Sequence, residues 1–114
     1  MNIKTNEYEV RHEVATHTAF FKGSLRLSST QEYAPIVQLL DEAASHNPAT
    51  VTLDLRELEF LNSSGINILA RFVIGVRQKG NIQMVVQGSK KFSWQAKSLQ
   101  NLQRLMPGLK LSVE

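Results

Sequence analysis

Residues 51–69 read VTLDLRELEFLNSSGINIL, and the order of patterns in them indicates the architecture of the chain. Val51, Leu53 and Leu55 alternate with polar residues, which is the period of a strand. The polar tetrad at 62–65 follows, and Asn and Ser are typical first residues of a helix. Apolar residues at helical spacing then continue to Val76. A strand that leads into a helix in this way predicts a parallel βαβ unit with right-handed crossovers.

On the N-terminal side of this unit, the residues at 8–14 and 16–25 are rich in Val, Thr, Tyr and Phe. They predict two antiparallel strands with a short connection around Ala15. A helix should follow, because Ser29 and Glu32 have the spacing of a capping box. Pro48 ends this helix, since a helix rarely continues through the residue before proline.

On the C-terminal side, Lys79 and Gly80 supply the basic last turn and the glycine at which the second helix ends. A strand at 82–86, a third helix at 93–106 and a last strand at 109–113 complete the chain. The order is ββαβαβαβ. It predicts an α/β fold in which residues 1–114 form a single domain, with helices packed on one mixed sheet.

The composition fits one domain with a real core: the chain has 114 residues, of which 42% are hydrophobic and 20% charged. The absence of cysteine excludes a disulfide scaffold, a thiol nucleophile and a cysteine metal cage. No apolar stretch has the length of a signal peptide or a membrane span. We therefore expect a cytoplasmic protein without membrane insertion.

Charge differs between the two parts of the chain. Residues 1–60 carry five basic and nine acidic residues, a net charge of −4, whereas residues 61–114 carry eight basic residues and one acidic, a net charge of +7. This asymmetry indicates either an anionic partner or two faces of one compact domain that attract each other. The basic residues are spread over several elements, and only Phe92 and Trp94 lie among them as aromatic residues. No nucleic acid is therefore expected as a partner.

No pattern of a metal or cofactor site is present. The three histidines, His12, His17 and His46, are isolated, and no carboxylates accompany them at metal-ligand spacing. No glycine-rich phosphate loop occurs either. We expect no metal, no cofactor and no enzymatic activity.

The tetrad Asn62, Ser63, Ser64 and Gly65 is the candidate functional segment. The start of a helix is electrically positive, so a phosphate on Ser63 would be stabilised there. Gly65, which has no side chain, would let another chain approach the backbone closely. The alternative is that these residues are ordinary N-cap residues.

The following helix indicates a partner surface independently. Its apolar residues cover more than half of its circumference, which is more than a helix on a sheet needs to bury. Ile68 and Phe72 lie at one margin, next to Arg71. Either the third helix, or the place of a final helix missing after the last strand, covers them, or they form a binding patch.

The tetrad followed by an apolar residue, Ile66, resembles the motif of the STAS family, the anti-sigma factor antagonist domains. That motif is Asp-Ser-Ser-Gly or Asp-Ser-Thr-Gly and an apolar residue. The strand at 51–55, the pair at 60–61 and the segment GSLRL at 23–27 are also similar to the family. The resemblance implies a mixed sheet with helices packed on it, no catalysis and no metal.

The resemblance also implies a mechanism. The unmodified domain binds an anti-sigma factor that is also a serine kinase, and the sigma factor is released. The kinase then phosphorylates the serine that matches Ser63, and a phosphatase resets it. The tetrad, its following apolar residue and the apolar margin of the second helix together give the candidate partner-binding residues, which are Asn62, Ser64, Gly65, Ile66, Ile68, Arg71 and Phe72.

Asn62 stands where the family has Asp, and it lacks the negative charge. This difference favours an alternative within the same resemblance. In that alternative the chain is a non-switching STAS subunit of a larger complex, such as a transporter assembly or a signalling scaffold.

Overall fold

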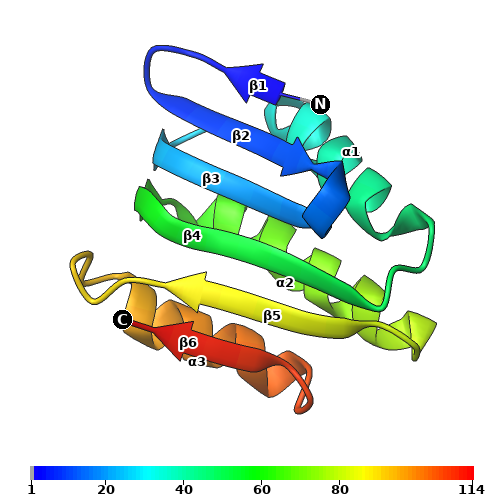
Figure 1. The fold of residues 1–114 in the computed structure, drawn as a ribbon. Coiled ribbons are helices and arrows are strands. Elements are labelled where there is room, and N and C mark those ends of the chain that lie inside the picture. The colour runs from blue at the N-terminus through cyan, green and yellow to red at the C-terminus, as the bar shows by residue number, and fades with distance from the viewer. Residues whose placement is uncertain (1) are drawn as a thin grey trace.

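The chain folds into one six-stranded sheet with three helices (Figure 1), and the structure, a computed structural model, describes residues 2–114. The strands are β1 (Asn2–Lys4), β2 (Tyr8–Glu13), β3 (Thr18–Leu25), β4 (Thr50–Leu61), β5 (Gln83–Gly88) and β6 (Lys110–Val113). The helices are α1 (Thr30–Ser45), α2 (Ser63–Lys79) and α3 (Gln95–Leu105). The strand order is β1-β2-β3-β4-β5-β6, so each strand lies beside its neighbours in sequence.

The sheet is mixed. β1, β2 and β3 pair antiparallel, and β3, β4, β5 and β6 pair parallel. The three helices are the crossovers between the parallel strands, and all of them lie on one face of the sheet (Figure 1). Right-handed crossovers between successive strands place helices in this way. The expected α/β fold with a mixed sheet is therefore confirmed.

The core lies between the helices and the sheet face that they cover. Leu53 on β4 and Val86 on β5 are fully buried, and so are Leu39 on α1 and Val73 on α2. Ser29 caps α1 as its spacing to Glu32 predicted, because its hydroxyl accepts a hydrogen bond from the Glu32 amide at 3.1 Å.

The first strand, β1, was not predicted, and the sheet has six strands where the sequence indicated five. β4 is also longer than expected. Two register shifts against β3 add residues to it, and its buried leucines change their spacing from two to three at Leu55, Leu58 and Leu61. Such β-bulges interrupt the alternation from which a strand is predicted.

The opposite face of the sheet has no helix on it and is polar. The Arg11 guanidinium lies 4.4 Å from the centroid of the Phe20 ring. Asp54 accepts hydrogen bonds from Nε and Nη2 of Arg56 at 3.0 and 2.7 Å. Within residues 2–114, no helix is both long and apolar enough to cross a bilayer.

Candidate functional site

The tetrad lies at the edge of the sheet where the parallel strands end. β4 ends at Leu61, α2 begins at Ser63, and Asn62 alone joins them. The backbone N–H of Asn62 donates to the carbonyl of Leu25, at the end of β3, at 3.2 Å. The loops that follow parallel strands gather at this edge, which is where open α/β sheets usually carry their binding sites.

The Asn62 side chain connects three parts of the fold. Its Oδ1 accepts hydrogen bonds from the Gly65 amide at 2.9 Å and from the Tyr33 hydroxyl of α1 at 2.7 Å. Its Nδ2 donates to the Leu27 carbonyl at 2.8 Å. Burial raises the pKa of Tyr33, so its hydroxyl stays protonated and remains a donor. These three bonds fix the start of α2 against α1 and the segment after β3.

Ser63 is the exposed member of the tetrad, whereas Ser64 and Asn62 are half-buried. Within residues 2–114, the structure gives the Ser63 hydroxyl no hydrogen-bond partner, because Asn62 supplies the N-cap. The first turn of α2 has no acidic residue to balance the positive end of the helix. A phosphate group on Ser63 would therefore meet unbalanced positive charge.

Gly65 does not act as we expected. It is buried, and a Cβ atom at this position would lie 2.7 Å from the Tyr33 hydroxyl and 2.9 Å from Cγ of Leu61. A Cβ atom essentially never lies this close to another heavy atom to which it is not bonded. The absent side chain makes room for the protein's own core, so the expectation of a close approach by another chain is wrong at Gly65.

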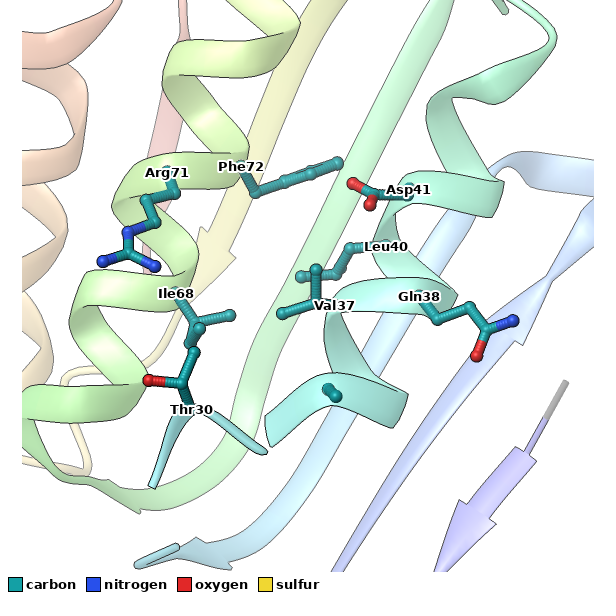
Figure 2. A pocket seen from close by; sticks show the side chains of 9 residues that line it. Thr30, Val37, Gln38, Leu40, Asp41, Ile68, Arg71 and Phe72 are labelled. Carbon is teal, nitrogen blue, oxygen red and sulfur yellow. The ribbon is translucent and has the colours of Figure 1, made fainter. Parts of the chain in front are cut away.

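Ile68 and Phe72 are 7% and 8% exposed, and they point toward α1 (Figure 2). Of the two alternatives, these side chains are covered rather than exposed as a patch, and the element that they face is α1 instead of the third helix. They form one wall of a groove between α1 and α2, which also has Val37 and Leu40 of α1 in its lining. Arg71 is exposed at the rim, and Ile66 is half-buried against the core.

The groove has a volume of about 400 Å³ and continues along both helices into a second hollow of about 290 Å³. Asp41, Arg71 and Phe72 line both hollows. In Figure 2 the Asp41 carboxylate extends from α1 toward the Phe72 ring of α2. The α1 side of this site was missed, since the pairing of two helices is not visible in either helix alone.

One signal could have connected the tetrad with α1. Tyr33 is the single hydroxyl-bearing residue among the buried residues of α1, and a buried phenol needs a hydrogen-bond partner. Asn62 is that partner.

Trp94 has a structural role, and the described residues that could bind a metal do not come together. Trp94 donates from Nε1 to the Glu59 carbonyl at 2.8 Å, so it connects the start of α3 to β4. In the part of the chain that the structure describes, no three His, Asp or Glu residues gather as metal ligands would.

The sequence matches no known family model and no curated protein. The fold does match solved structures of SiaC from Pseudomonas aeruginosa. One is similar with a TM-score of 0.76 and 11% identity over 100% of this chain and 96% of that chain. Another, of SiaC as activator in complex with the diguanylate cyclase SiaD, has a TM-score of 0.75 and 11% identity over 100% and 99%. Apo-SiaC has a TM-score of 0.73 and 10% identity over 100% and 98%. At this identity the likeness shows a shared fold.

Proposed function

We propose that this chain is a regulatory module without catalytic activity that binds a protein partner. The partner docks at the start of α2, at Asn62, Ser63 and Ser64, and along Ile66, Ile68, Arg71 and Phe72. The observation that carries the proposal is Ser63, an exposed serine at the unbalanced positive end of a 17-residue helix. The fold adds support, because SiaC, which shares it over its whole length, is an activator found in complex with its enzyme.

The same serine supplies a switch in this proposal. A phosphate on Ser63 adds about −1.5 to −2 charges at neutral pH. Placed at the start of α2, it would be held by the free N–H groups of the first turn and would change the charge that a partner meets. By the resemblance to the STAS family, the partner is a serine kinase that also acts as an anti-sigma factor.

The second candidate function is a non-switching subunit of a larger complex, and Asn62 favours it. Its Nδ2 donates to the Leu27 carbonyl, which an aspartate in this position could not do. The position that is acidic in the STAS motif therefore holds the fold together here.

Photo-crosslinking tests the docking surface. A benzophenone amino acid at position 63, introduced into the protein in its native host, is expected to give a discrete adduct with one protein. The same amino acid at position 100, an exposed site on α3, is the matched control. Equal adducts from both positions, or none from position 63, would contradict docking at the start of α2.

Phosphorylation is tested on the partner that is crosslinked. Incubation of the two proteins with ATP is expected to add the mass of one phosphate group to the native protein and none to Ser63→Ala. If the complex forms, is stoichiometric and ignores ATP, the non-switching alternative holds. If Ser63→Ala is also phosphorylated, the switch lies at another residue.

A further inference from the structure

The groove between α1 and α2 has an elongated shape. Both helices begin at the carboxyl edge of the parallel strands, so they run in the same direction beside each other (Figure 1). α1 has 16 residues, which corresponds to a length of about 24 Å. Small residues leave the space open: Ala34 lines the first hollow and Gly75 the second, and a Cβ atom on Gly75 would meet nothing within 4 Å.

The two rims of the groove carry opposite charges. Asp41 belongs to α1, whereas Arg71 and Lys79 belong to α2. Both ion pairs in residues 2–114 are made by Arg56, so neither Asp41 nor Arg71 is neutralised by a neighbour. The floor between them is apolar and includes Val37 and Phe72. A ligand that fits has an apolar centre, a basic group on the α1 side and an acidic group on the α2 side.

We propose that the groove holds one amphipathic helix of the protein partner. Large apolar side chains of that helix enter the two hollows, a Lys or Arg lies beside Asp41, and an Asp or Glu lies beside Arg71. This inference rests on the proposed docking function and names the chemistry of its partner.

A helix fits the groove better than an extended peptide does. The backbone groups of α1 and α2 bond within their own helices, so the groove offers no strand edge to which an extended chain could add. A third helix instead packs its side-chain ridges into the space between two others. Apolar anchors at positions i, i+3, i+4 and i+7 would then follow the groove from one hollow to the next.

Selection from a phage-displayed library of helical peptides of about 18 residues, roughly 27 Å long, tests this inference. The native protein is the bait, and phage that bind the variant Ala34→Trp are removed first. Ala34 is exposed on α1, so an indole at this position fills the groove without entering the core. Enriched peptides are expected to show apolar residues at helical spacing, with basic residues on one flank and acidic residues on the other.

Affinities of synthetic copies, measured by fluorescence anisotropy, supply the controls. Ala34→Trp and Asp41→Lys are each expected to weaken binding about tenfold or more. Ala96→Trp, an exposed site on α3, is expected to leave it unchanged. Thermal unfolding followed by circular dichroism shows whether each variant folds. If Ala34→Trp is unfolded, the affinity of Asp41→Lys alone tests the groove.

The inference is overturned if no peptide is enriched or if the enriched peptides lack helical spacing. It is also overturned if they bind both groove variants as well as the native protein. A native dimer that Ala34→Trp dissociates would assign the groove to a second copy instead. Failure of the docking function is distinct: peptides would still bind the groove, while position 63 would crosslink to no partner.

Discussion

Asn62 needs both halves of its amide. The oxygen accepts from the Gly65 amide and the Tyr33 hydroxyl, and the nitrogen donates to the Leu27 carbonyl. Aspartate keeps the two accepted bonds but has no donor, and its charge would face the Leu27 carbonyl oxygen. The side chain that matches the acidic residue of the STAS motif is therefore specified here by the interior of the protein.

Asn62→Asp is accordingly expected to destabilise the protein by about 1–2 kcal/mol, because a half-buried carbonyl loses its donor. Urea unfolding measures this change. The control is Ser63→Ala at the exposed neighbour, with an expected change within about 0.5 kcal/mol. An Asn62→Asp protein as stable as the native one would show that the bond to Leu27 is dispensable.

Two glycines of α2 give opposite expectations for the same substitution. Gly65→Ala places a methyl group against Leu61 and Tyr33 and is expected to cost about 1–3 kcal/mol. Gly75→Ala meets open space and is expected to stabilise the helix by about 0.5–1 kcal/mol. Thermal unfolding of the two variants compares them directly. If both variants shift the melting temperature in the same direction, the close packing of Leu61 and Tyr33 against Gly65 is contradicted.

His12 makes the stability sensitive to acid. Its Nε2 atom is buried without a hydrogen-bond partner among residues 2–114, and burial lowers the pKa of His12 below its ordinary 6.5. Below about pH 6.5 the unfolded chain binds the proton more readily than the folded one. Stability should therefore fall as the pH decreases from 6.5 through the folded-state pKa, and it should not depend on His12 above this range.

The unfolding midpoint, which is the denaturant concentration at which half of the protein is unfolded, is measured at about pH 8 and about pH 5 and gives the loss of stability on acidification. His12→Gln is expected to reduce the difference between the two midpoints, whereas His46→Gln, at an exposed position, should leave it in place. If the midpoint falls by the same amount on acidification in all three proteins, protonation of His12 is not the cause of the acid sensitivity.

At the scale of elements, Gln95 holds the irregular part of β4 in place. It is fully buried in the first turn of α3, and its Nε2 donates to the carbonyls of Leu55 and Leu58 at 2.7 and 2.9 Å. Its Oε1 accepts from the Ser89 amide at 2.7 Å. The pairing of β4 with β5 ends at Asp54, so these two carbonyls lie beyond that ladder, and the Gln95 side chain of α3 satisfies them.

Gln95→Ala is expected to cost about 2–4 kcal/mol, because several buried polar groups lose their partners at once. Gln100→Ala on the exposed side of the same helix is the matched control and should change stability by less than about 0.5 kcal/mol. Chemical denaturation gives both values. A small effect at Gln95 would mean that water replaces its bonds.

The helices could be predicted from the sequence more closely than the strands. The apolar stripes and caps of α1 and α2 are local, and the structure begins and ends both helices close to the predicted positions. β1 has three residues, too few for any period to be recognised. The extension of β4 to Leu61 could not be predicted, because its bulges interrupt the alternation and two of its carbonyls bond Gln95, more than 30 residues away.

The candidate site also has one part that could be predicted from the sequence and one that could not. Ser63 follows from the tetrad alone, since a strand–helix junction places it at an exposed helix start. The groove needs the side-by-side packing of α1 and α2, which no single segment encodes.

At the scale of the whole molecule, the strand order converts a charge gradient along the sequence into one in space. The elements β1 to β4 and α1 contain most of the acidic residues of positions 1–60, where the net charge is −4. The helices α2 and α3 and the strands β5 and β6 belong to positions 61–114, where the net charge is +7, and form the other end. The longest extent of the molecule is 35 Å, which exceeds the Debye length of about 10 Å at 0.1 M salt. The two ends therefore act as separate charges.

Light scattering is expected to detect attraction between molecules at about 10 mM salt and its loss near 150 mM. Changing Lys90 and Lys91 to Glu lowers the charge of the second part from +7 to +3 and should weaken this attraction. If the protein molecules repel one another at every salt concentration, the two ends do not act as separate, opposite charges.

The sequential strand order also bears on how the protein is made. Each strand pairs only with the strands before and after it in sequence. During synthesis, every newly emerged strand finds its neighbour already translated, and each crossover helix has a sheet on which to pack. The sheet can therefore lengthen one unit at a time on the ribosome, and no pairing has to wait for a later segment.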